Sequence, residues 1–379
     1  MEYSSCMDGP SYPAARIVAE RLSARAAAST VYANTQDVTR PDVATIEKII
    51  TTAFWASLRR EEGRAPKISI AFLSPEQSAR PVQLNPRVPL DANLLARLAP
   101  AVEKPGIHIG VWSYDGQLCT WGITRMIPKW CFILEVIGPG FLVVKYRRDD
   151  ASTKFANIAV LEGSQVKFIE QQPSGMSELP PALSSLWTFY SSAGRSDSDN
   201  ILVKIAIAMR AHGRGGSLLI VPKGSHEWRA SIVQPIAHSL VAPFPDIVTF
   251  LQRNADSDDV SPLTLQSAVD ALAGLTSVDG ATIISDRFEP LAFGAKILTR
   301  DAAHRVDQVL LTEPIEGISD LVVDPALLGG TRHLSAAQFS LDQRNSIALV
   351  ASQDGQFTIF AWSPLKNMVH AYRLDALLI

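Results

Sequence analysis

A stretch rich in proline and glycine divides this sequence into two parts with different patterns of apolar residues. It runs from Gln171 to Pro181 and contains three prolines and one glycine. Such clusters interrupt helices and strands, because proline lacks a backbone N–H and glycine has unusual conformational freedom. The chain is 379 residues long, which fits two domains of ordinary size. We therefore predict a linker over residues 173–183.

The part before the linker begins with helical patterns and continues as short strands. In the clearer helical pattern, from Pro41 to Glu62, apolar residues recur at helical spacing, with Pro41 in the first turn and Gly63 as the stop. Further along, Asp115-Gly116 between two apolar runs indicates a hairpin. We expect a helical segment over residues 1–66 and a β-rich domain over 67–172. The expected strands are Ile107–Tyr114, Gln117–Ile123, Cys131–Ile137, Phe141–Tyr146, Phe155–Leu161 and Gln165–Ile169.

The part after the linker, residues 184–379, alternates between helical and strand patterns. This alternation predicts a mixed sheet flanked by helices, so the fold class of the whole chain is α+β. The expected helices are Ile201–His212, Pro262–Leu275 and one beginning at Thr331, and the expected strands are Ser217–Val221, Ala281–Ser285, Pro290–Ile297, Ser346–Ala351 and Phe357–Trp362.

Composition and charge indicate which classes of binding partner are not expected. The formal net charge of −3 gives no general attraction to nucleic acid, so we predict no nucleic-acid partner. No apolar run is long enough to cross a bilayer and no secretory signal is readable, so we predict no membrane association. The three scattered cysteines, Cys6, Cys119 and Cys131, form neither a disulfide framework nor a zinc motif. These features favour a cytoplasmic protein.

A first motif, Asp279-Gly280-Ala281, places a carboxylate on the turn between an expected helix and an expected buried strand. The glycine allows the backbone to approach a ligand closely, and the small alanine leaves room beside it. An Asp-Gly pair alone is a common turn, and turn chemistry by itself can explain it.

A second motif, Gly330-Thr331-Arg332-His333, precedes a helical run. Free backbone N–H groups at a helix start, together with a hydroxyl, a guanidinium and an imidazole, form an anion site suited to phosphates. Taken singly, Thr331 reads as an N-cap and the Arg332-His333 pair as a solvated helix face. A carboxylate combined with an anion site suggests a metal ion and a triphosphate.

With these two motifs, residues from about Ser184 to the end resemble the diadenylate cyclase superfamily, specifically the nucleotide-binding domain of the DNA integrity scanning protein DisA. That family has an Asp-Gly-Ala turn that enters a strand, a second strand, and a Gly-Thr-Arg-His-Arg segment that opens a helix. The matching segments here are Leu272–Ala281, Leu291–Ile297, Gly330–Ala336 and Ile347–Phe360.

The resemblance implies a reaction in which two facing subunits each hold one ATP, and a 3′-hydroxyl attacks the partner's α-phosphorus. It implies a homodimer or a larger assembly, with Mg²⁺ or Mn²⁺ as cofactor. Asp279 would bind the metal and, with Arg332, act in catalysis if the site is active. The residues that would contact the nucleotide are Asp279, Gly280, Ala281, Gly330, Thr331, Arg332, His333 and Ser335.

Leu334 departs from this family, which has a second arginine at that position. Leucine donates no hydrogen bond, and loss of one transition-state donor costs on the order of 10²- to 10³-fold in rate. The chain is also similar to a divergent branch described as probable sensor domains of the DACNV type, in which an N-terminal module precedes the cyclase-like fold. A sensor binding ATP or a cyclic dinucleotide, an active cyclase making cyclic di-AMP, and a scaffold with an empty site remain as alternatives. Asp279 favours the cyclase, because a pure sensor has less need for a metal ligand.

A glycine-rich segment, His212-Gly213-Arg214-Gly215-Gly216, resembles a phosphate-binding loop. It follows an expected helix and leads into an expected strand, which is the reverse of the order in a P-loop. We interpret it as the turn that ends the helix.

Overall fold

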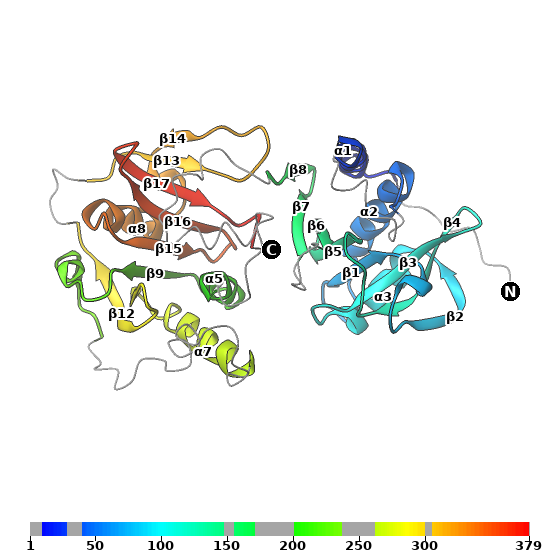
Figure 1. The fold of residues 1–379 in the computed structure, drawn as a ribbon, viewed down its shortest axis with the longest axis horizontal. Coiled ribbons are helices and arrows are strands. Elements are labelled where there is room, and N and C mark those ends of the chain that lie inside the picture. Colours follow the sequence, from blue (N-terminus) through cyan, green and yellow to red (C-terminus); the bar gives the residue numbers. More distant parts are fainter. Residues whose placement is uncertain are drawn as a thin grey trace. The chain divides into compact units, whose positions relative to one another are not determined.

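The computed structural model describes residues 10–28, 40–147, 155–170, 201–236, 262–299 and 305–378. Within it the chain forms two compact units, Met1–Ile169 and Glu170–Leu378. The predicted linker lies outside the described residues. Each unit is built around a mixed β-sheet with helices, which confirms the predicted α+β class (Figure 1).

The N-terminal unit has an eight-stranded sheet in the order β2-β4-β3-β1-β5-β6-β7-β8. Strands β1 and β3 are parallel, and all other neighbours are antiparallel. The elements are α1 Pro13–Ala28, α2 Val43–Ser57, β1 Ile68–Phe72, β2 Val82–Pro89, α3 Ala92–Val102, β3 His108–Tyr114, β4 Gln117–Thr124, β5 Phe132–Gly138, β6 Phe141–Arg147, β7 Phe155–Glu162 and β8 Gln165–Phe168.

The expected meander from β3 to β8 is present, with strand ends within one or two residues of those expected. The prediction for α2 was too long at both ends. Asp42 caps this helix by accepting a hydrogen bond from the Thr45 N–H at 2.8 Å, so Pro41 lies before the cap. The helix ends at Ser57, where the half-buried and buried residues give way to exposed Leu58.

A single apolar core joins the helices of this unit to one face of its sheet. Ile49 and Ile50 of α2, Leu95 of α3 and Ile70 of β1 are fully buried in it. Helix α3 and strand β2 were not among the elements expected from the sequence. Both lie between Ile68 and Ile107. The signal for α3 was present and missed, because Asp91 is a capping residue and the apolar residues after it recur at helical spacing. Strand β2 is mostly exposed and shows no clear alternation.

The C-terminal unit has a nine-stranded sheet in the order β10-β12-β11-β9-β15-β16-β17-β13-β14. Helix α8 lies along β15 and β16, and α5 and α7 lie against each other (Figure 1). The elements are α5 Ile201–Ala211, β9 Gly216–Val221, β10 Ile232–Val233, α7 Pro262–Leu275, β11 Ala281–Ser285, β12 Pro290–Ile297, β13 Val309–Thr312, β14 Leu321–Val323, α8 Thr331–Asp342, β15 Ile347–Ala351, β16 Phe357–Ser363 and β17 Met368–Arg373.

The central strands of this sheet are buried on both faces. Leu219 and Val221 of β9 join the core beneath α8, whereas Leu218 and Ile220, which alternate with them, are equally buried and point to the other face. This burial explains why β9, β11 and β15 appear in the sequence as continuous apolar runs. Every helix and strand expected in this unit is present.

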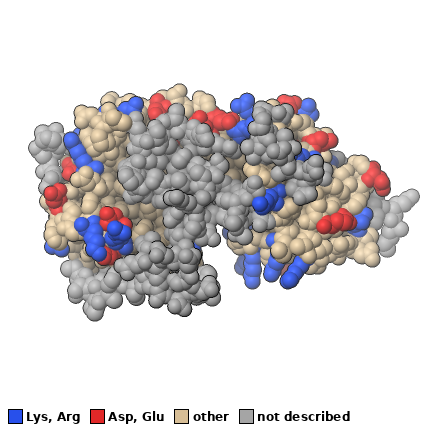
Figure 2. Space-filling model, in the orientation of Figure 1, with Lys and Arg blue, Asp and Glu red and all other residues tan. Residues whose placement is uncertain are grey.

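Charge is distributed over both units. Acidic and basic side chains occur on each of them in the face shown in Figure 2, in keeping with the small net charge. In the part of the chain that the structure describes, no helix is long and apolar enough to span a membrane.

Candidate functional site

A cavity of about 710 Å³ lies at one edge of the C-terminal sheet, within the usual range of ligand pockets. Its walls come from segments that are distant in the sequence. The eight residues predicted to contact a nucleotide all line it: Asp279, Gly280, Ala281, Gly330, Thr331, Arg332, His333 and Ser335.

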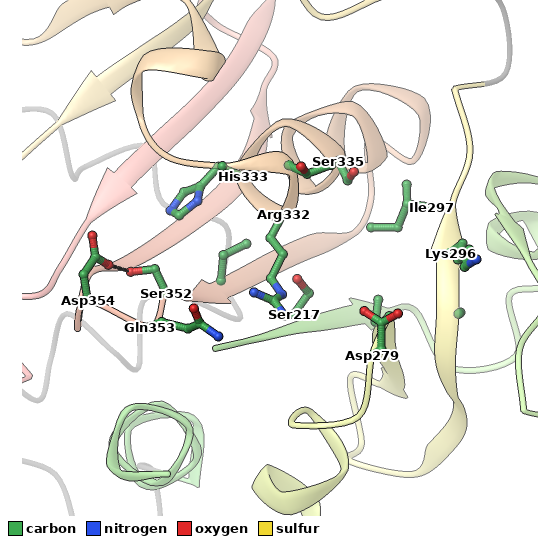
Figure 3. Close-up of a pocket in the computed structure, with 16 residues that line it drawn as sticks. Ser217, Asp279, Lys296, Ile297, Arg332, His333, Ser335, Ser352, Gln353 and Asp354 are labelled. Carbon is green, nitrogen blue, oxygen red and sulfur yellow. Dashed lines mark hydrogen bonds between the residues drawn. The ribbon is translucent and has the colours of Figure 1, made fainter. Parts of the chain in front are cut away.

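Strand register explains why these segments meet. The parallel strands β9 and β11 start at the same edge, with Ser217 paired to Ala281. Strand β15 runs antiparallel to β9, so its last residue, Ala351, pairs with Gly216 at that edge. The turn before β11 and the turn after β15 therefore both open toward the first turn of α8, as Figure 3 shows.

Asp279 and Arg332 approach this cavity from different elements. Asp279 rises from the turn before β11, and Arg332 extends from the first turn of α8 toward Ser217 (Figure 3). Both side chains are exposed. No hydrogen bond or ion pair joins either of them to the described part of the chain. The cavity thus contains a carboxylate and a guanidinium that do not neutralise each other.

The close approach of a neighbouring strand requires the glycine of the Asp-Gly-Ala turn. Gly280 has a φ of +104°, and a Cβ there would lie 2.5 Å from the carbonyl carbon of Gly294 in β12. The sequence interpretation, close approach to a ligand, is therefore incomplete, because the protein's own backbone already requires a glycine. Ala281 is buried and pairs with Ala295 of β12.

Helix α8 begins without a capping side chain. The N-cap residue is Gly330, which corrects the reading of Thr331 as the N-cap. Thr331 is the first helical residue and is exposed. Because Gly330 has no side chain to accept hydrogen bonds, no side chain caps the N–H groups of Thr331 and Arg332, two residues that line the cavity. An uncapped helix start favours anions.

His333 is buried, so the reading of Arg332-His333 as a solvated face is wrong for the histidine. Only 2% of it is exposed, and its Nε2 atom has no hydrogen-bond partner among the described residues. Burial lowers the pKa of its imidazole, and the nearby positive charge of Arg373 lowers it further. A Cβ on Gly329 would lie 2.3 Å from His333 Nδ1, so Gly329 provides the space for this ring.

The cavity also includes residues that sequence reasoning missed. Lys296 of β12 is an exposed cation in its wall, and it forms no ion pair within the described chain. The turn after β15 contributes Ser352, Gln353 and Asp354. A hydrogen bond from the Ser352 hydroxyl lowers the pKa of the Asp354 carboxyl. The signal for this turn was Asp354-Gly355, another Asp-Gly pair, three residues after the end of the buried strand β15.

Leu334, which stands where the family has its second arginine, does not line the cavity. It is half-buried and packs against the core between α8 and the sheet. Arg332 and Ser335 are three residues apart and share one face of α8, whereas residue 334 is turned about 200° from residue 332. In this chain, position 334 therefore contributes to packing.

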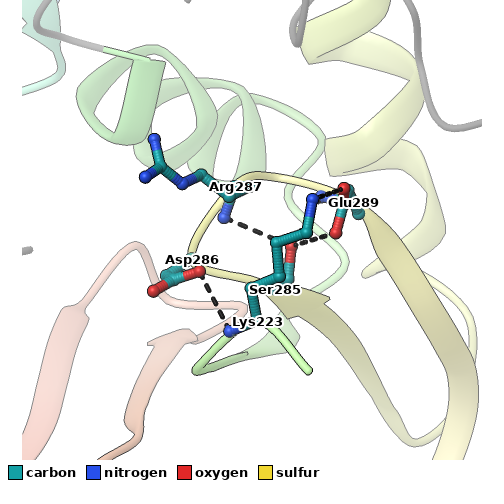
Figure 4. A network of polar contacts seen from close by, with 5 residues as sticks. All are labelled: Lys223, Ser285, Asp286, Arg287 and Glu289. Atoms are coloured by element: carbon teal, nitrogen blue, oxygen red, sulfur yellow. Dashed lines mark hydrogen bonds and ion pairs between the residues drawn. The ribbon is translucent and has the colours of Figure 1, made fainter. Parts of the chain in front are cut away.

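The opposite end of β9 and β11 provides a contrast. There Lys223 Nζ forms an ion pair with Glu289 Oε1 at 2.7 Å, and Ser285 donates to the other carboxylate oxygen at 3.1 Å (Figure 4). The hydrogen bond from Lys223 lowers the pKa of Glu289. Lys223 and Glu289 at that end pair with each other, whereas Asp279, Lys296 and Arg332 at the cavity have no such partner among the described residues.

The cavity has two carboxylates, Asp279 and Asp354, and only Asp354 accepts a hydrogen bond from a side chain of the described residues, Ser352. Among the described residues, no group of three or more His, Cys, Asp or Glu side chains could hold a metal ion by itself. Mg²⁺ commonly binds through one or two carboxylates together with substrate phosphates. Asp279 fits that arrangement when a phosphorylated ligand is present.

Sequence comparison identifies a family only for the N-terminal part. Residues 35–125 match the family of probable sensor domains DACNV. This range covers α2, α3 and strands β1 to β4, and it does not include the cavity of the C-terminal unit. No curated protein matches the chain. The chain thus contains, over residues 35–125, a region similar to a probable sensor domain.

Proposed function

We propose that this protein is a nucleotide-binding sensor. The cavity of the C-terminal unit binds ATP or a related nucleotide, including a cyclic dinucleotide, and the N-terminal unit transmits the signal to a partner. One observation carries the proposal: Asp279 and Arg332 line the same cavity and neither has a partner within the described protein. The similarity of residues 35–125 to probable sensor domains supports the signalling role.

The phosphates would lie between α8 and β12. Arg332, Lys296 and the uncapped first turn of α8 provide positive charge and N–H donors there. The buried edge of His333 adds a neutral imidazole, because its lowered pKa favours the uncharged ring at pH 7. Binding should therefore grow with the number of phosphates and weaken with salt.

Mg²⁺ or Mn²⁺ would be held by Asp279 and the phosphates of the ligand. The ion would neutralise phosphate charge beside the carboxylate, which would otherwise repel the nucleotide. Asp279 positions the ion, and Gly280 and Ala281 shape the wall next to it. In this proposal Asp279 serves binding, which answers the argument that a pure sensor has less need for a metal ligand.

The alternative is an active diadenylate cyclase, which requires a homodimer or a larger assembly so that two nucleotides face each other. Leu334 supports the sensor over the cyclase, since its side chain lies in the core and supplies no charge to the cavity. A scaffold with an empty site is the third possibility. A scaffold gives no reason why Asp279, Lys296 and Arg332, which have no ion-pair partner among the described residues, should surround one cavity.

Three measurements separate these functions. Isothermal titration calorimetry of the purified chain with ATP and Mn²⁺ should show binding that Asp279→Asn weakens mainly in the presence of metal. Chromatography after prolonged incubation should show unchanged ATP. Cyclic di-AMP that is formed by the wild type and lost in Asp279→Asn would establish the cyclase instead. Nucleotide-dependent stabilisation above about 2 kcal/mol at saturating ligand would exclude the scaffold.

A further inference from the structure

The glycine-rich loop after α5, residues 212–216, lies against the guanidinium of Arg332. Gly213 and Gly215 both have positive φ, +65° and +71°. Their surroundings differ. A Cβ on Gly215 would lie 3.0 Å from Arg332 Nη1 and 3.3 Å from the carbonyl oxygen of Ala351, whereas a Cβ on Gly213 would meet nothing within 4 Å. Only one of the two glycines therefore has a neighbour to accommodate.

The loop is also tied to the turn after β15. Gln353 Nε2 donates a hydrogen bond to the Arg214 carbonyl at 3.3 Å, and Gln353 Cγ lies 3.3 Å from the Cβ position of Gly215. Gly213 N–H donates to the Arg210 carbonyl at 3.1 Å, which ends α5 as the sequence predicted. The loop thus ends a helix and also forms a wall beside the cavity.

We infer that Gly215 is a positioning residue for Arg332, and that the absence of a side chain at this position sets where the guanidinium points. This inference rests on the proposed nucleotide site. Arg332 is exposed and has no hydrogen-bond or ion-pair partner in the described chain, so close contacts such as the one beside Gly215 limit where its guanidinium can lie before a ligand arrives. The guanidinium is a rigid planar fork that binds phosphate through paired hydrogen bonds, and a displacement of a few tenths of an ångström weakens that geometry.

The test compares Gly215→Ala with Gly213→Ala. Both substitutions place a side chain at positive φ and carry similar backbone strain, but only Gly215→Ala pushes against Arg332. Affinities for ATP and for adenosine are measured by calorimetry. We expect Gly215→Ala to weaken ATP binding about tenfold and to leave adenosine binding within about twofold. Gly213→Ala should leave both unchanged.

A double-mutant cycle adds a readout that a general structural defect would not produce. Gly215→Ala acts through Arg332, so combining it with Arg332→Ala should weaken ATP binding no further than Arg332→Ala alone. Equal losses in Gly213→Ala and Gly215→Ala, or additive losses in the double variant, would overturn the inference.

A spectroscopic measurement keeps this test separate from the nucleotide proposal. The Arg332 Nε–H resonance, assigned with Arg332→Lys, should move in Gly215→Ala and stay in place in Gly213→Ala, without any ligand. A shift without ATP binding by the wild type would retain the positioning role and refute the nucleotide site. An unmoved resonance would refute the positioning role, whatever the nucleotide affinity.

Discussion

Asp279 and Arg332 line one cavity from two separate elements, a turn before a strand and the first turn of a helix, and they form no ion pair with each other. Opposite charges that stay unpaired at a cavity are available to a ligand that has both anionic groups and a bound cation. A metal–nucleotide complex has this character.

Replacement of Arg332 by alanine should weaken ATP binding by about 10- to 100-fold, because a hydrogen bond to a charged group contributes about 1.5–3 kcal/mol. Arg287, an exposed arginine at the opposite end of β11 (Figure 4), provides the matched control. Calorimetry should show no change for Arg287→Ala. A similar loss in both variants would indicate a nonspecific charge effect and contradict the site.

Introduction of the family's second arginine by Leu334→Arg should not improve nucleotide affinity, because residue 334 packs against the core and does not line the cavity. We expect a loss of about 1–2 kcal/mol in the free energy of unfolding, from lost apolar burial. Leu334→Met keeps the volume and should cost less than about 1.5 kcal/mol. Urea unfolding and calorimetry measure the two effects separately. Tighter ATP binding by Leu334→Arg would show that this side chain can reach the cavity.

Gly280→Ala should destabilise the C-terminal unit by about 3 kcal/mol or more, because the new Cβ would lie 2.5 Å from the Gly294 backbone at a φ of +104°. Gly274 in α7 is the control, since a Cβ there meets nothing within 4 Å. Gly274→Ala should stabilise the protein by about 0.5–1 kcal/mol, because alanine favours helices. Thermal unfolding measures both changes. A change of stability in the same direction in the two variants would contradict this account.

The N-terminal unit should lose stability in mild acid through His108. Its Nδ1 lies 2.7 Å from Ser69 Oγ, and burial lowers its pKa from 6.5 to about 4, against a raising effect of Glu135. Above pH 6.5 the ring is neutral in both the folded and the unfolded chain, and the stability is complete. As the pH falls toward 4, only the unfolded chain takes up the proton, so up to about 3 kcal/mol is lost.

Urea unfolding at several pH values between 7 and 4 measures this loss. His108→Asn should flatten the pH dependence in that window, whereas His226→Asn, which changes an exposed histidine, should retain it. An unchanged slope in His108→Asn would show that other groups cause the acid sensitivity.

Local signals in the sequence determined the elements of this protein. The hairpin at Asp115-Gly116, the start of α8 at Thr331 and the buried strands β9 and β11 follow from turn chemistry and apolar runs, which depend on neighbouring residues only. The two motifs at residues 279–281 and 330–333 could be read in the same way. The signal for α3 was also present, in the Asp91 cap and the helical spacing of the apolar residues after it, and was missed. Strand β2 is mostly exposed and gave no clear signal.

Only the tertiary structure decided which of these side chains line the cavity and which are buried. The register of β9, β11, β12 and β15 brought Lys296 and Asp354 to the same cavity as Asp279 and Arg332, and helical rotation turned Leu334 against the core. His333 is buried because Gly329 leaves space for its ring, and Gly280 is required by the approach of β12. The physical reason is that a side chain's neighbours across a sheet depend on strand order and register, which involve residues far apart in the chain.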